Sequence, residues 1–151
     1  MILKHNFWTV LNCFPQWLLG LIIIAVLGAE FEKWYKGRKV FCFEKGKKRR
    51  WKWLTWFHGR FSGTALYHTI LPHDSGSKTI AHEWGHHVDG DKWGWLYLPV
   101  IGVASLCNNL ESGKVGYNKA YYHKYPEWQA DRNGGVRHVN CEGENCVREF
   151  P

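Results

Sequence analysis

The chain opens with an apolar block, residues 7–29, and then changes to short alternating segments. The uninterrupted part of the block, 17–29, is shorter than the roughly 20 residues that a membrane-spanning helix needs. The whole block reaches that length only by admitting Asn12, Pro15 and Gln16. It predicts an N-terminal hydrophobic helix embedded in a membrane. A buried core helix and a cleaved signal remain as alternatives.

Beyond residue 29 the polar and apolar positions predict strands first. The segments "KVFCFE" at 39–44 and "RRWKWLTWF" at 49–57 alternate with the period of two that is typical of strands. The segment 64–72 alternates in the same way and ends at a proline. A later apolar stretch, 93–106, is too short to cross a bilayer. It forms either core or a shallow membrane contact.

Two segments have the helical period. Residues 79–90, "TIAHEWGHHVDG", carry an apolar stripe at spacings of four that fastens the helix to a core, formed by Ile80, Trp84 and Val88. Gly85 in this helix leaves room for another segment to approach closely. A second, shorter helix, "PEWQADRN", has Pro126 at its first position. The pattern predicts an α+β fold in which a small antiparallel sheet packs with these two helices, preceded by the hydrophobic N-terminal helix.

The charged residues predict a basic surface. The chain has 20 Lys and Arg against 13 Asp and Glu, and eleven of the basic residues lie within 30–60. Aromatic residues alternate with them, a combination that can bind single-stranded nucleic acid. Beside a hydrophobic block it more economically indicates a belt at the membrane interface, with cations on anionic lipid. We therefore expect membrane contact through residues 7–29 and 33–60, and rank nucleic-acid binding last.

The same basic residues and the cysteines indicate that the chain after residue 29 lies in the cytoplasm. If residues 7–29 span a bilayer, the basic excess that follows them places the rest of the chain in the cytoplasm, and a shallower anchor leaves it there too. The five cysteines are odd in number and scattered, which argues against a disulfide framework. Cys141 and Cys146 could form a hairpin disulfide or remain two thiols.

Candidate chemistry lies in the first of the two predicted helices. His82 and His86 are four residues apart and so share one helix face, where two imidazoles can bind a divalent cation. Glu83 lies beside the metal and can take a proton from a water bound to it, as in the His-Glu-x-x-His arrangement of zinc peptidases. His87 points about 100° away, and we expect it to be exposed or hydrogen-bonded.

A catalytic zinc requires a third protein ligand and one open position. Glu127 in the second helix supplies the ligand, and Asp131, one turn later, can accept a hydrogen bond from a ligand imidazole. His123 is the alternative third ligand. A donor must also stabilise the oxyanion, and the candidates that precede the ligand helix are Tyr121, Tyr122, His123 and Tyr125.

These two motifs carry a family resemblance. His82-Glu83-Trp84-Gly85-His86 followed by Glu127-Trp128-Gln129-Ala130-Asp131 resembles the gluzincin metallopeptidases with a Glu-x-x-Ala-Asp helix, such as the CAAX-processing and HtpX-type membrane proteases. The chain also resembles a group of short, uncharacterised bacterial proteins with an "LPQ-x-LLG"-like N-terminus and "LYLPVIG" after the zinc helix. The resemblance implies His82, His86 and Glu127 as zinc ligands and Glu83 as base. It implies no substrate.

The expected protein is a small zinc metallopeptidase that hydrolyses peptide or protein substrates. It consists of an anchor segment, 1–29, and a minimal zincin-like domain, 30–151. Two alternatives remain: a non-catalytic protein with a structural zinc site, and a basic module for membrane surfaces or nucleic acid. Structural sites are normally closed by four ligands, often cysteines, and no cysteine lies near either motif.

Overall fold

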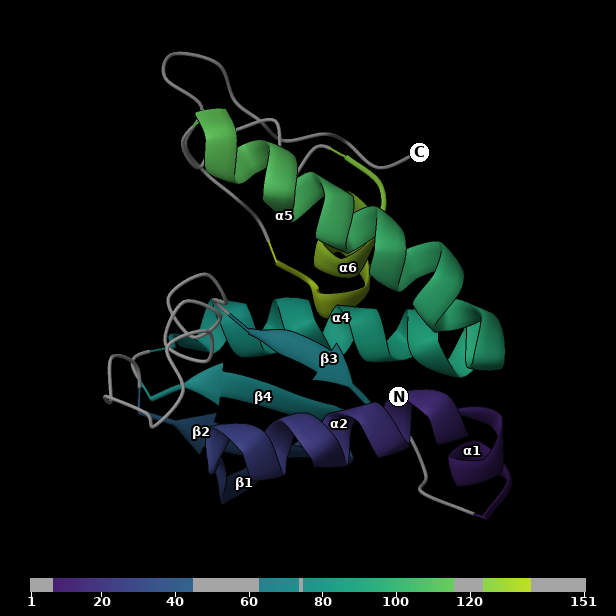
Figure 1. Cartoon of the computed structure of the whole chain (residues 1–151), viewed down its shortest axis with the longest axis vertical. Helices are drawn as coiled ribbons and strands as arrows, with labels where there is room; N and C mark the ends of the chain where they lie inside the picture. Colours follow the sequence, from purple (N-terminus) through teal and green to yellow (C-terminus); the bar gives the residue numbers. More distant parts are fainter. Residues whose placement is uncertain (1–6, 45–62, 74, 116–123, 137–151) are drawn as a thin grey trace.

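The structure is a computed structural model and describes residues 7–44, 63–73, 75–115 and 124–136. The predicted strand 49–57 and His123 lie outside the described residues. In chain order the elements are α1 (Phe7–Asn12), α2 (Phe14–Leu27), β1 (Glu30–Tyr35), β2 (Arg38–Phe43), β3 (Thr64–Leu66), β4 (His68–Pro72), α4 (Ser77–Trp93), the 3-10 turn η1 (Gly94–Leu96), the π-helical turn η2 (Leu98–Gly102), α5 (Val103–Val115) and α6 (Glu127–Gly134) (Figure 1). The fold is α+β, as the sequence predicts.

The four strands form one sheet in the order β1-β2-β4-β3. The pairs β1–β2 and β3–β4 are antiparallel, but β2 and β4 are parallel. The prediction of a purely antiparallel sheet is therefore wrong. After β2 the next strand in the sheet is β3, at the edge of the sheet. The chain then reverses direction between β3 and β4, so β4 runs in the same direction as β2 and pairs with it.

Two turns with positive φ shape the sheet. Lys36 and Gly37 have φ of 45° and 85°, which is the conformation that a two-residue hairpin between β1 and β2 requires. Tyr67 has φ of 61° and divides the predicted strand 64–72 into β3 and β4. The guanidinium of Arg38 lies 4.6 Å from the centre of the Tyr67 ring, a cation–π contact that stabilises this unusual turn residue.

Helices cover both faces of the sheet. One core cluster lies on the α4 face and contains Val40, Cys42, Leu71 and Ile80. A second lies on the α2 face and contains Leu27, Phe43 and Ile70. Neighbouring residues on a strand point to opposite faces, so Ile70 and Leu71 of β4 each contribute to a different cluster. Helix α6 lies between α4 and α5 (Figure 1).

The N-terminal apolar block forms two helices rather than the one that was predicted. Pro15, which has no N–H to donate, lies in the first turn of α2, and Gly28 ends this helix with φ of 57°. The block packs onto the rest of the chain, since buried Gln16 donates a hydrogen bond of 2.7 Å to the carbonyl of Gly94. Among the helices of the described ranges, none has the length and apolar character needed to cross a membrane.

The apolar segment 93–106 is core on one side only. Tyr97 and Ile101 are buried, whereas five large apolar side chains are exposed: Trp95, Leu96, Val100, Val103 and Leu106. The indole nitrogen of Trp95 donates a hydrogen bond of 3.0 Å to the carbonyl of Leu11, which joins η1 to α1. Exposed apolar residues of α1 and of η1 therefore lie next to each other.

Candidate metal centre

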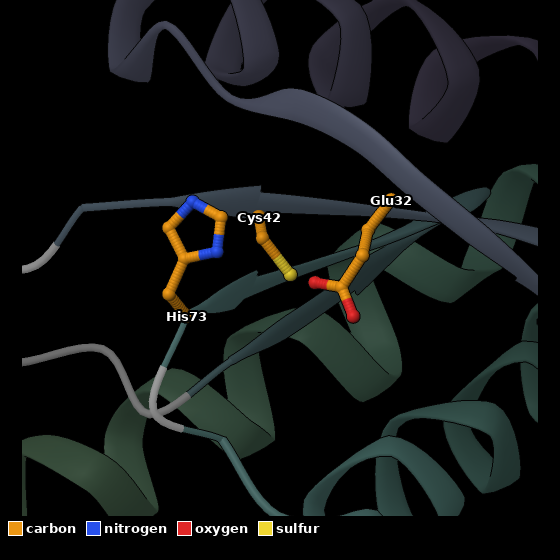
Figure 2. A group of neighbouring side chains, drawn as sticks. All are labelled: Glu32, Cys42 and His73. Carbon is orange, nitrogen blue, oxygen red and sulfur yellow. The ribbon is translucent and has the colours of Figure 1, made fainter.

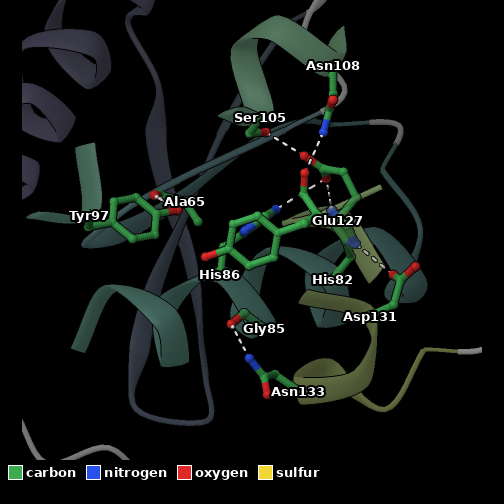
Figure 3. A network of polar contacts seen from close by, with 11 residues as sticks. Ala65, His82, Gly85, His86, Tyr97, Ser105, Asn108, Glu127, Asp131 and Asn133 are labelled. Atoms are coloured by element: carbon green, nitrogen blue, oxygen red, sulfur yellow. Dashed lines mark hydrogen bonds and ion pairs between the residues drawn. The ribbon is translucent and has the colours of Figure 1, made fainter. Parts of the chain in front are cut away.

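Helices α4 and α6 bring two imidazoles and one carboxylate together. The Nε2 atoms of His82 and His86 lie 3.2 Å and 3.4 Å from the same oxygen, Oε2 of Glu127. The imidazole rings are 4.9 Å apart and nearly perpendicular. All three side chains are buried and point toward one another (Figure 3). Three donor atoms thus converge on a space of the size that one cation occupies.

Glycines make the close approach of α6 to α4 possible. A Cβ on Gly85 would lie 1.9 Å from the carbonyl oxygen of Ala130, and one on Gly134 would lie 2.2 Å from that of Ala81. The side chain of Asn133 also donates to the carbonyl of Gly85 at 3.3 Å. The expectation that Gly85 admits another segment is confirmed. Without these glycines Glu127 could not reach the two histidines.

Further hydrogen bonds orient two of the three side chains that could bind the metal. Nδ1 of His82 lies 2.7 Å from a carboxylate oxygen of Asp131, so its proton is donated there and Nε2 is left to face Glu127. The hydroxyl of Ser105, from α5, donates to Oε1 of Glu127 at 2.6 Å. This bond occupies one carboxylate oxygen and leaves Oε2 to face the histidines.

The electrostatics of the cluster follow from burial and from these hydrogen bonds. Burial lowers the pKa of His82, but hydrogen bonds to Asp131 and Glu127 outweigh it and raise the pKa to about 10. For Glu127, burial raises the pKa, and the hydrogen bonds from His82 and His86 outweigh it and hold the pKa well below its usual value. In the metal-free cluster, hydrogen bonds from the imidazoles of His82 and His86 therefore keep the carboxylate of Glu127 charged.

Glu83 lies at the same site but faces a cavity. The cavity has a volume of about 380 Å³ and is lined by Glu83, both histidines, and residues of β3 and α5. A Cβ on Gly63 would lie 2.6 Å from Oε1 of Glu83, so this glycine leaves room for the carboxylate. Burial raises the pKa of Glu83, the direction expected of a carboxylate that acts as a proton acceptor near neutral pH.

Of the remaining predicted residues, the structure describes His87 and Tyr125. His87 is buried and its Nε2 lies 2.8 Å from the hydroxyl of Thr69, so of its two predicted environments the hydrogen-bonded one is correct. Tyr125 is 38% exposed, and its carbonyl accepts a hydrogen bond from Asn108. Tyr121 and Tyr122 lie outside the described residues.

Sequence reasoning missed two residues of the site. Ser105 contacts the carboxylate of Glu127, and the buried ring of Tyr97 lines the cavity, with its hydroxyl 3.4 Å from the carbonyl of Ala65. Burial, and then the charge of Glu83, hold the pKa of Tyr97 well above its usual value. Both residues belong to the segment 93–106, whose apolar character gives no sign of a polar contact.

The donor set of the cluster is one that zinc uses. Two imidazole nitrogens and a carboxylate oxygen are the ligands of catalytic zinc in one class of peptidases, with water in the fourth position. An imidazole whose other nitrogen donates to a carboxylate, as His82 does to Asp131, is the usual arrangement around a bound zinc. The residues present therefore fit this metal.

No family model, curated protein or solved structure matches the chain. The resemblance to the gluzincin peptidases thus rests on the two sequence motifs alone.

Proposed function

We propose that the protein is a zinc-dependent metalloendopeptidase of the gluzincin type, with His82, His86 and Glu127 as metal ligands. The observation that carries the proposal is the convergence of three buried donor atoms beside a cavity into which a separate carboxylate, Glu83, also faces. A non-catalytic zinc site requires the ligands but not Glu83. Three protein ligands are also the number that catalytic zinc sites use.

The chemistry follows from the positions of the side chains. A zinc ion held by this set would lower the pKa of a water to about 7 and polarise the scissile carbonyl. Glu83, at the cavity wall, would accept a proton from the attacking water and return it to the leaving amine. Asp131 fixes the orientation of His82, and Ser105 fixes that of Glu127.

The experiment that tests the proposal is a cleavage screen. The zinc-loaded protein is incubated with a diverse peptide library, and new termini are identified by mass spectrometry. We expect cleavage that a chelator abolishes and added zinc restores. Zinc binding without any cleavage would favour the non-catalytic alternative.

We also propose that the protein is attached to the cytoplasmic surface of an anionic membrane through its N-terminal helices. The support is an exposed apolar surface on α1 and α2, formed by Phe7, Trp8, Leu11, Phe14, Leu18, Leu19, Leu21, Ile22 and Val26. The formal net charge of +7 complements anionic lipid. Three exposed residues, Leu19, Val103 and Leu106, also line the cavity, so the apolar surface reaches the site.

A further inference from the structure

A second group of metal-binding side chains lies at the sheet, on elements that the first site does not use. Glu32 of β1, Cys42 of β2 and His73, which follows β4, each offer one ligand atom, and these atoms all lie within 4.8 Å of one another. Figure 2 shows the carboxylate, the thiol and the imidazole gathered at one place. Glu32 and His73 are exposed, whereas Cys42 is only 4% exposed.

The backbone of three strands places these side chains. The register between β1 and β2 shifts between Phe31 and Lys33, so Glu32 is the extra residue of a β-bulge. Bulges change the direction in which a side chain points, and here the carboxylate of Glu32 reaches Cys42. The N–H of His73 donates to the carbonyl of Phe43 at 3.2 Å, which extends the pairing of β2 with β4 by one residue.

In the absence of metal, Glu32 of this group contacts Cys42 by a hydrogen bond and Lys33 by an ion pair. Burial, and then the hydrogen bond to Glu32, raise the pKa of the Cys42 thiol to about 12, so the thiol is protonated and donates to the carboxylate. A divalent ion that binds the sulfur displaces this proton to solvent, and a metal–thiolate bond replaces the S–H bond. Lys33 also contacts Glu32, at 3.1 Å, but its side chain is 47% exposed and can turn into water.

We propose that Glu32, Cys42 and His73 form a second metal site, which takes zinc or another divalent ion that prefers thiolate and imidazole. One sulfur, one nitrogen and one oxygen suit zinc, and water completes a tetrahedral set on the exposed side. The bound ion connects β1, β2 and the turn that leads into α4. It therefore fastens the sheet to the start of the helix that carries His82.

The test uses cobalt, because cobalt bound to a thiolate absorbs in the near ultraviolet. The first site has no sulfur ligand, so this band distinguishes the second site from the first. We expect the reduced full-length protein, titrated with Co²⁺, to develop the band and to saturate at one thiolate-bound ion per chain. Absence of the band in the wild type would overturn the proposal, whatever the outcome at the first site.

Variants assign the band to its ligands. Cys42→Ser should abolish it and reduce bound zinc by one ion per chain. Because Cys42 is in the core, the exposed ligands provide independent tests: Glu32→Gln and His73→Ala should each weaken Co²⁺ binding at least about tenfold. Cys107→Ser, which changes an exposed thiol on α5, is the matched control and should leave the band unchanged. A band that persists in Cys42→Ser, or is lost in Cys107→Ser, would contradict the assignment.

Discussion

The imidazole of His82 donates its Nδ1 proton to the carboxylate of Asp131 across 2.7 Å, and this contact is one of several that join α4 to α6 at the candidate metal centre. Both side chains are buried, so the hydrogen bond is shielded from water. It fixes the tautomer of His82 and leaves Nε2 to face Glu127.

The first prediction concerns this contact. Asp131→Asn keeps the shape of the side chain but removes its charge, and we expect zinc affinity to fall about 10- to 100-fold. Chelator competition measures the change. Glu111→Gln, which removes an exposed carboxylate that pairs with Lys124, is the control and should leave the affinity unchanged. Equal affinities of Asp131→Asn and wild type would show that Asp131 does not orient a ligand.

The second prediction separates the two candidates for the third ligand. Glu127→Ala should release the zinc of the His82 and His86 site, because it removes the oxygen on which both histidines converge. His123→Ala should retain it. Zinc content per chain, measured in the Cys42→Ser background to remove the second proposed site, gives the comparison. The reverse order would make His123 the ligand.

The third prediction concerns the packing of α6. In Gly85→Ala the new methyl would lie 1.9 Å from the carbonyl oxygen of Ala130, so α6 must move. Overpacking of this kind costs about 1–3 kcal/mol. Gly102→Ala, where the nearest atom lies at 3.6 Å, should not destabilise the protein. The unfolding temperature and the zinc affinity should both fall in Gly85→Ala and stay at the wild-type values in Gly102→Ala. A Gly85→Ala variant with wild-type stability and affinity would contradict the observed contact between α4 and α6.

The sequence predicted those parts of the site that depend on spacing within one helix, and missed those that depend on how the chain folds. Spacings of four residues placed His82 and His86 on one face of α4, and Glu127 and Asp131 on one face of α6. Helical periodicity is a local property, so these relationships could be read without the fold. That Ser105 reaches Glu127 depends on the path of the chain through η1 and η2, which no local pattern records.

The errors in the fold have the same origin. Tyr67 is not a typical turn residue, and its positive φ is accompanied by a contact with Arg38 that is distant in sequence. The alternation across residues 64–72 therefore looked like one strand, and the parallel pairing of β2 with β4 could not be anticipated. The division of the N-terminal block into α1 and α2 was not predicted, although Pro15, which fits only the first turn of a helix, could have indicated it.

The fourth prediction concerns membrane attachment. Phe7 and Trp8 are about 70% exposed at the tip of α1 (72% and 71%), so their replacement by serine should weaken binding to vesicles that contain anionic lipid. Leu110→Ser, which changes an exposed leucine on α5 outside both stretches expected to contact the membrane, is the control. Co-sedimentation at two salt concentrations measures the effect. Stronger binding to nucleic acid than to anionic vesicles would favour the alternative of a nucleic-acid module.

The most direct test of a catalytic zinc site is the Glu83→Gln variant. An amide cannot accept the proton of the water, so cleavage of a peptide identified in the library screen should fall about 10²- to 10⁴-fold. Glutamine has nearly the same shape as glutamate, and the variant should bind as much zinc and unfold at the same temperature as the wild type. Turnover and zinc content are measured on the same zinc-loaded samples. A Glu83→Gln protein that retains its zinc and cleaves the peptide at the wild-type rate would contradict the proposed mechanism.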